Sequence, residues 1–299
     1  MGIWARRIKA PGTSPKSMVE GVRLKMRIRP WLLMASITLP LALGLGTQVQ
    51  AAPVPVSLPL IRAQQLLARL GYLPLHWKPL LTDTKVTLAQ AWQSPPRGTW
   101  TWRQQPEILH TLWASPGIDT VVTRGALMTF QRVNGLVPTG SINLATERAL
   151  DSAWLRRERD PHGYNYALVD EYLGSNHPET ITLWHNGKVV LKSLCNTGVQ
   201  QAQTPLGTYP VYLRYYSQTM SGTTPWGTSY NDPGVPYVNY IDGGVAVHGF
   251  PRAAYGFPQS LGCIELPIPN AAIAWLYLHI GTLVTVVANA PSGATTVSA

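Results

Sequence analysis

A cysteine and a histidine separated by a glycine-rich segment are the residues of this 299-residue chain best suited to covalent chemistry. Cys263 follows Gly262, whose missing side chain lets a substrate approach the backbone closely. His248 lies fifteen residues earlier, directly after the apolar run 245–247, which predicts a strand end. A thiol needs a base or a lowered pKa to act as a nucleophile, and histidine titrates close to neutral pH. The pair therefore predicts a cysteine nucleophile with a histidine as proton donor and acceptor.

The residues around the thiol are candidates for positioning a substrate. The main-chain N–H groups at Leu261, Gly262 and Cys263 can donate to the oxyanion of a tetrahedral intermediate. Gly249, after the histidine, and Ser260, the polar side chain closest in sequence to the thiol, complete the predicted positioning residues. The Tyr- and Trp-rich segment 225–240 either lines a cleft or packs internally, and the sequence leaves both alternatives open.

Strands are the main elements expected around this pair. They are rich in β-branched and aromatic residues and lie at 181–185, 188–191, 208–215, 245–247 and 282–288. Asn186-Gly187 predicts a tight hairpin turn because it tolerates positive φ. A long loop is expected over 221–234, and Asn270 is expected to cap a helix over 271–280. The result is a β-rich domain with one helix beyond the cysteine.

Four segments of this part form a recognisable series: T-P-L-G-T-Y at 204–209, A-V-H-G at 246–249, S-L-G-C-I-E-L at 260–266 and G-T-L-V-T-V at 281–286. Together they resemble the L,D-transpeptidase catalytic domain of the YkuD family over residues 179–288. The resemblance implies a β sandwich whose cysteine attacks the peptide bond between the third and fourth residues of a peptidoglycan stem. D-Alanine would leave and a thioester would form on Cys263. The acyl group would then pass to an amine, giving a 3–3 cross-link, or to water. His248 matches the catalytic histidine of the family.

Two residues depart from the pattern of that family. Leu261 stands where a second histidine is usual, so the side-chain hydrogen bond is lost while the main-chain N–H remains. Glu265 stands where a basic or amide residue is common, and we expect it to change substrate preference. Because His248 is retained, the resemblance implies an active variant.

A small helical module is predicted over residues 61–155. Its three amphipathic segments lie at 61–70, 122–133 and, after the capping residue Asn143, 145–153. The series L-x-x-L-G-Y at 67–72, R-G-A-L-M-T-F-Q-R-V-N-G-L at 124–136 and T-E-R-A-L at 146–150 resembles the peptidoglycan-binding type 1 repeat. An insert over 76–116 contains five tryptophans, which favour a local core, with stacking on sugar rings as the alternative.

The first 51 residues have the features of a secretory signal peptide. A basic segment precedes an uncharged apolar run, and small residues follow at Ala51-Ala52. An uncleaved N-terminal anchor is the alternative, and no other stretch reaches the length of a membrane span. We therefore expect an exported protein in the cell envelope or outside the cell. The remaining boundaries are a spacer at 52–60, a polar linker at 156–178 and a C-terminal tail at 289–299.

Charge and cysteine content exclude several classes of function. The formal net charge is +10, but residues 1–52 carry +7 of it, so the remainder is close to neutral and nucleic-acid binding is disfavoured. Cys195 lies on one face of a predicted strand, which favours a buried free thiol over a disulfide with Cys263. His162, His177 and His185 lack the spacing of a metal site, so neither a metal nor a cofactor is expected.

The sequence therefore predicts an α+β multidomain protein, in which a small peptidoglycan-binding-like helical bundle precedes a mostly β, YkuD-like sandwich. The predicted function is that of an exported cysteine L,D-transpeptidase, with peptidoglycan as donor and acceptor and no membrane contact beyond the leader. Two alternatives stay open: an L,D-carboxypeptidase using the same Cys and His, and a non-catalytic wall-binding protein. The oligomeric state is left open.

Overall fold

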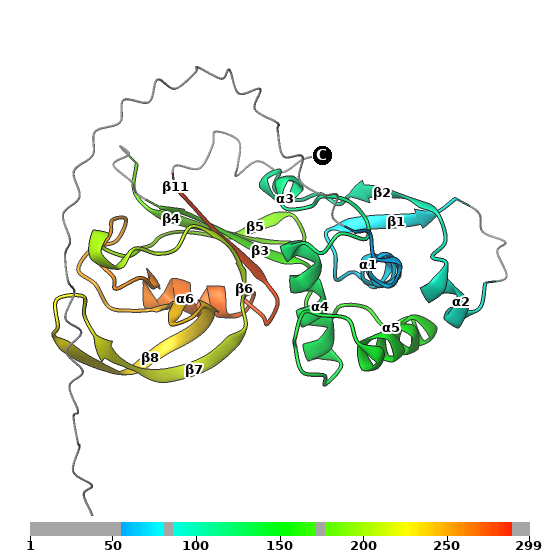
Figure 1. Ribbon diagram of the computed structural model, residues 1–299. Helices are drawn as coiled ribbons and strands as arrows, with labels where there is room; N and C mark the ends of the chain where they lie inside the picture. Colours follow the sequence, from blue (N-terminus) through cyan, green and yellow to red (C-terminus); the bar gives the residue numbers. More distant parts are fainter. Residues whose placement is uncertain (1–54, 81–85, 172–176, 289–299) are drawn as a thin grey trace, which may run out of the picture. The chain divides into compact units, whose positions relative to one another are not determined.

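The computed structural model describes residues 55–80, 86–171 and 177–288 (Figure 1). The predicted signal peptide, the first part of the spacer and the predicted tail lie outside these residues. Within them, none of the helices has the length and apolar character needed to cross a membrane. The structure therefore bears on the helical module and the β-rich domain.

The three predicted helices of the N-terminal module are present, and their caps are the expected kind of residue. Asn143 accepts a hydrogen bond from the main-chain N–H of Thr146 at 2.9 Å, which fixes the start of α5. Ser57 caps α1 in the same way, so that this helix begins inside the predicted spacer. The helices in the described residues of the module are α1 Leu58–Leu70, α2 Leu88–Gln93, α3 Ile108–Thr111, α4 Val121–Val133 and α5 Leu144–Arg156.

The tryptophan-rich insert folds around a two-stranded hairpin of β1 (Leu75–Pro79) and β2 (Gly98–Trp102). Trp77 and Trp92 are 7% and 9% exposed, and both belong to the core of the helical module. The other tryptophans of the insert pack against that core and are partly buried: Trp100, Trp102 and Trp113. This burial favours the interpretation of the insert as a local core over that of a sugar-stacking surface.

One sheet of the β-rich domain has the strand order β5-β4-β3-β11-β6. The predicted hairpin is confirmed, because Asn186 and Gly187, both at positive φ, connect β4 to β5. Strand β3 lies within the range predicted as a linker and pairs in parallel with β11 near the centre of the sheet. The strands are β3 Asn165–Glu171, β4 Thr180–His185, β5 Lys188–Leu194, β6 Gly207–Pro210 and β11 Leu283–Ala288.

The second sheet has the order β10-β9-β8-β7 and carries the predicted Cys and His at its β9–β10 side. Its strands are β7 Leu213–Thr223, β8 Ser229–Asp242, β9 Val245–Gly249 and β10 Ile264–Leu266. The loop predicted over 221–234 is wrong, since β7 and β8 form a long antiparallel hairpin with only 224–228 between them. The predicted strand 208–215 is also divided, because its two ends pair in different sheets as β6 and β7.

Helix α6 (Ile268–Trp275) lies between the two sheets (Figure 1), and its apolar face joins the core that both sheets bury. It begins three residues before the predicted start, and Asn270 is not its cap. The Asn270 amide instead donates to the Ser193 hydroxyl at 2.7 Å. A proline in the first turn explains the earlier start, because no intrahelical N–H is required there.

Strand alternation assigns the side chains of the first sheet to two cores. In β3, Ala167 and Val169 face α6 and the second sheet, whereas Tyr166 and Leu168 belong to the core of the helical module. The backbone of helix α4 also packs closely against the segment that precedes β11. A Cβ placed on Gly125 of α4 would lie 2.6 Å from the carbonyl oxygen of Gly281, so this position requires glycine.

Candidate active site

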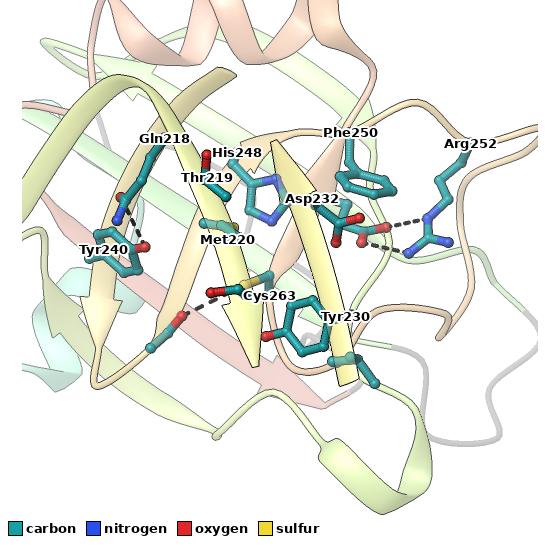
Figure 2. Close-up of a pocket in the computed structure, with 14 residues that line it drawn as sticks. Gln218, Thr219, Met220, Tyr230, Asp232, Tyr240, His248, Phe250, Arg252 and Cys263 are labelled. Carbon is teal, nitrogen blue, oxygen red and sulfur yellow. Dashed lines mark hydrogen bonds and ion pairs between the residues drawn. The ribbon is translucent and has the colours of Figure 1, made fainter. Parts of the chain in front are cut away.

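Two adjacent parallel strands bring Cys263 and His248 into one cavity. Strand β9 ends just after His248, and β10 begins immediately after Cys263. The register pairs Glu265 with His248, so their side chains lie on the same face of the sheet, and Cys263 precedes Glu265 by two residues. Both predicted catalytic side chains line a cavity of about 340 Å³ (Figure 2). The chemistry expected from the sequence thus has a place in the fold.

The β7–β8 hairpin supplies the opposite wall of this cavity. Ser221, Tyr230, Asp232 and Tyr240 come from the predicted loop or the Tyr- and Trp-rich segment, whereas Gln218, Thr219 and Met220 lie before both of these ranges. The Tyr240 hydroxyl donates to the Gln218 side chain at 3.1 Å (Figure 2). Trp226, in contrast, is 60% exposed and is not among the lining residues. Only part of the aromatic segment therefore borders the site.

His248 is held in one orientation and one tautomer. Its side chain is 2% exposed, and this burial lowers the pKa of the imidazole, which keeps the ring neutral near pH 7. Its Nδ1 lies 3.0 Å from the Gly249 carbonyl oxygen. Because a carbonyl oxygen only accepts, Nδ1 carries the proton and Nε2 is free to accept one. The imidazole is therefore prepared to act as a base through Nε2.

The Cys263 thiol is protonated at rest. It is partly accessible from the cavity, and its Sγ lies 3.8 Å from the Gly244 carbonyl oxygen. Burial of the sulfur raises the pKa of the thiol to about 11; a hydrogen bond from the Ala246 backbone opposes this rise and the Glu265 carboxylate adds to it. At pH 7 only about one thiol in 10⁴ would ionise without help. A nucleophilic role for this cysteine thus requires proton transfer to a base.

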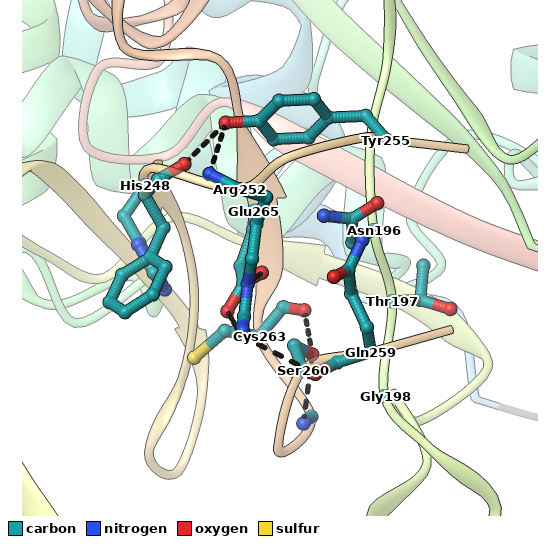
Figure 3. A network of polar contacts seen from close by, with 12 residues as sticks. Asn196, Thr197, Gly198, His248, Arg252, Tyr255, Gln259, Ser260, Cys263 and Glu265 are labelled. Carbon is teal, nitrogen blue, oxygen red and sulfur yellow. Dashed lines mark hydrogen bonds and ion pairs between the residues drawn. The ribbon is translucent and has the colours of Figure 1, made fainter. Parts of the chain in front are cut away.

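A short network of hydrogen bonds fixes the turn before the cysteine (Figure 3). The Ser260 hydroxyl donates to the Cys263 carbonyl oxygen at 2.6 Å and accepts from the main-chain N–H of Gly262 at 3.1 Å. Gly262 has a φ of 109°, a conformation that side chains rarely adopt. Its N–H group is therefore occupied in this state, and the N–H groups of Leu261 and Cys263 stay predicted donors to the oxyanion.

Thr204 is a residue of this turn that sequence reasoning did not single out. Its hydroxyl donates to the Gly262 carbonyl oxygen at 3.0 Å and accepts from the main-chain N–H of Gly198 at 2.9 Å. Thr204 is the first residue of the T-P-L-G-T-Y segment, which gave a signal for the family but none for a role. Its place explains why a threonine is useful there, because its hydroxyl joins Gly198 to Gly262, the residue before Cys263.

Gly249 and Leu261 occupy different kinds of position around the pair. The Gly249 carbonyl holds His248, and a Cβ at Gly249 would lie 3.1 Å from Pro236 and 3.2 Å from Ala271, so the close packing favours glycine. Leu261 lines the cavity and is 37% exposed. An apolar side chain thus lines the cavity beside Cys263, at the position where the family pattern has a histidine.

Glu265, which is buried, and Arg252, which is half-buried, form an ion pair beside Cys263 and His248. Arg252 donates from Nε to Oε2 at 2.8 Å and from Nη2 to Oε1 at 2.7 Å, and Glu265 is only 4% exposed. The guanidinium also lies 4.7 Å from the centre of the Phe250 ring. The two-point geometry is the strongest arrangement for this kind of pair. Sequence reasoning noticed Glu265 but missed its partner.

Neither cysteine is oxidised in the structure, and Cys195 is buried in the core between the sheets. The disulfide alternative therefore has no support. In the part of the chain that the structure describes, no three His, Cys, Asp or Glu side chains lie together as metal ligands. The chemistry available at the site is that of a thiol, an imidazole and main-chain N–H groups.

Comparison with known proteins identifies the β-rich domain. Residues 165–287 match the model of the YkuD family, described as the L,D-transpeptidase catalytic domain. No curated protein matches the chain.

Several solved structures of L,D-transpeptidases are similar, each with a TM-score of 0.35. LdtMt1 in complex with imipenem is 21% identical, with 41% of this chain and 59% of that chain covered. An L,D-transpeptidase from Mycobacterium smegmatis is 24% identical, with coverage of 42% and 59%. The catalytic domain of the E. faecium enzyme is 28% identical, with coverage of 40% and 96%.

The chain thus spans about three fifths of the length of the first two of these proteins. The assignment rests on the family match, which begins at β3 and ends within β11 and so includes both sheets and α6. Over residues 165–287, from β3 to β11, the chain therefore matches the L,D-transpeptidase catalytic domain of the YkuD family.

Proposed function

We propose that this protein is an exported cysteine L,D-transpeptidase that acts on peptidoglycan stem peptides. The observation that carries the proposal is the position of a protonated thiol, Cys263, and a neutral histidine, His248, in one cavity. The Nδ1 of that histidine is hydrogen-bonded to the Gly249 carbonyl oxygen, which leaves Nε2 as the base. This is the arrangement that a thiol nucleophile with a high pKa requires.

In the first half of the reaction, Nε2 of His248 accepts the thiol proton, and Sγ of Cys263 attacks the carbonyl carbon of the third residue of the stem. The main-chain N–H groups of Leu261 and Cys263 are the predicted donors to the oxyanion. When the tetrahedral intermediate collapses, the C–N bond breaks and His248 returns the proton to the leaving amine. D-Alanine departs and the acyl group remains on Cys263 as a thioester.

In the second half, an amine of another stem attacks the thioester carbon while His248 again accepts a proton. The C–S bond breaks, the sulfur regains a proton, and a 3–3 cross-link forms. Attack by water through the same steps would yield a shortened stem and make the enzyme a carboxypeptidase. The two outcomes share every residue of the first half, so the acceptor decides between them.

Peptidoglycan is the proposed partner of the whole chain, and the helical module is its proposed second contact. Support for the module comes from its resemblance to the peptidoglycan-binding repeat and from its three capped helices. Its tryptophans are buried in the core or packed against it, so polar side chains on its surface are the better candidates for that contact. Export and location in the cell envelope are proposed from the leader sequence.

Digestion of purified peptidoglycan with residues 52–299, followed by mass analysis of the muropeptides, tests the proposal. We expect 3–3 cross-linked dimers from the native protein and none from Cys263→Ala. Stems shortened to tripeptides without dimers would instead establish the carboxypeptidase, and unchanged muropeptides would leave a wall-binding protein. Treatment with a carbapenem provides a separate measure of the first half-reaction, because Cys263 should gain the mass of the drug and the alanine variant should not.

A further inference from the structure

We propose that Asp232 binds the ammonium group of the acyl acceptor and so directs the acyl-enzyme to an amine rather than to water. The inference rests on the proposed function and names the side chain that would select the acceptor. It follows from the position of Asp232, from the charges in the cavity and from the chemistry of the second half-reaction.

Asp232 lies on β8, across the β7–β8 ladder from Met220, and lines the cavity that contains Cys263 and His248. It is half-buried, and Figure 2 shows its carboxylate near His248 and Arg252. Its charge acts on both His248 and Arg252: it opposes the lowering of the His248 pKa by burial, and it adds to the rise of the Arg252 pKa that the Glu265 hydrogen bond causes. A group bound to this carboxylate would therefore be close to the base that must remove its proton.

The charges lining the cavity do not balance. Asp232 and Glu265 are carboxylates and Arg252 is the one cation among the lining residues, since His248 is neutral and Cys263 is a thiol. Arg252 makes both of its short bonds to Glu265. Among the described residues, no hydrogen bond or ion pair joins a side chain to the Asp232 carboxylate. A net negative charge thus remains, and it lies at Asp232.

An uncompensated carboxylate in a partly enclosed site attracts a cation and repels another carboxylate. Once the thioester has formed, the reactant that must enter is an amine, which arrives as an ammonium ion. Water carries no charge and gains nothing from Asp232. The carboxylate should therefore raise the local concentration of the amine relative to water, and so its share of the product.

The proton balance of this step is complete with residues already in the cavity. The ammonium bound by Asp232 loses one proton, through Nε2 of His248, to solvent. The free amine then attacks the thioester carbon, the C–S bond breaks, and the second proton of the amine passes to the sulfur of Cys263. Asp232 neither gives nor takes a proton in these steps, so it is a binding residue for the acceptor.

The test compares Asp232→Asn, Asp232→Glu and Asp242→Asn in an assay with a disaccharide tetrapeptide as both donor and acceptor. The ratio of cross-linked dimer to hydrolysed tripeptide is measured by mass spectrometry as the concentration of the peptide increases. We expect Asp232→Asn to lower this ratio about tenfold, the scale of one charge-assisted contact, and Asp232→Glu to restore part of it. Asp242 is an exposed carboxylate at the end of the same strand, outside the cavity, and its variant should behave as the native protein.

Two further measurements separate this role from others. Hydroxylamine, a nucleophile that is neutral at the assay pH, should capture the acyl group equally well in native protein and Asp232→Asn. Carbapenem acylation, which needs no acceptor, should change far less than the dimer ratio. The inference would be overturned if Asp232→Asn gave the same ratio of cross-linked dimer to hydrolysed tripeptide as the native protein. A raised KM for the donor without a change in that ratio would overturn it as well. Failure of the native protein to be acylated would instead refute the proposed function itself.

Discussion

The pH dependence of acylation distinguishes a thiol activated by His248 from a thiolate that forms by itself. Burial raises the pKa of Cys263 to about 11, so the thiolate fraction without a base would increase tenfold with each pH unit below that value. Burial lowers the pKa of His248 below the ordinary value, so the neutral base is already dominant at pH 7. Between pH 7 and pH 9, a free thiolate predicts a rate increase of about a hundredfold. The His248 mechanism predicts a constant rate over the same interval.

The assay is the rate of carbapenem attachment to Cys263, followed by quenching and intact-mass analysis at a series of pH values. The rate should fall only on the acid side, below about pH 6.5, as His248 becomes protonated. His248→Gln removes the base, so its residual rate should be low at pH 7 and rise with pH along the thiolate slope. A native rate that rises about a hundredfold from pH 7 to pH 9 would refute the assignment of His248 as the base.

Three other substitutions test the structure around the site. Glu265→Gln leaves the half-buried Arg252 guanidinium without its carboxylate partner. The free energy of unfolding measured in urea should therefore fall by about 2 kcal/mol. The double variant that also carries Arg252→Gln should recover part of this loss. Thr204→Val removes the hydroxyl that joins Gly198 to Gly262, so acylation should slow and urea unfolding should show a loss of about 1–3 kcal/mol; native values for both would contradict its bridging role. Gly125→Ala places a methyl group 2.6 Å from the Gly281 carbonyl oxygen, so the Tm should fall. A Tm equal to that of the native protein would contradict this expectation, because it would show that α4 can move away from Gly281.

Cys263 and His248 were predictable as a candidate pair because the proposed chemistry depends on residue type and on a short local pattern. His248 follows an apolar strand, and Cys263 follows a glycine whose φ of 109° excludes most side chains. Both signals are contained in the immediate sequence around each residue. The Asn143 cap of α5 was predictable for the same reason, since a capping side chain accepts a hydrogen bond from a main-chain N–H three residues away.

The β7–β8 hairpin was not predictable, because its sequence contains the residues that usually break strands. Pro233, Gly234 and Pro236 lie within β8, and Tyr237 has a positive φ of 58°, so the alternation typical of a strand is interrupted. Pairing along most of β7 nevertheless keeps the chain extended. Asp232 was not predicted as a site residue for the same reason. When 221–234 is taken as a loop, nothing in the sequence indicates that this carboxylate lies near Cys263, which is 31 residues further along the chain.

Glu265 shows how a departure from a family pattern is resolved only in three dimensions. Considered alone, an acidic residue two positions after the nucleophile should oppose thiolate formation, and the Glu265 charge does raise the pKa of Cys263. The fold places Arg252 against both carboxylate oxygens, so a cation is still present beside the site, although it is supplied by a different segment. The pair therefore limits the electrostatic effect of Glu265. The carboxylate that remains without a cation is Asp232, and for this reason we expect the choice of acceptor, rather than the activation of the thiol, to be what distinguishes this cavity.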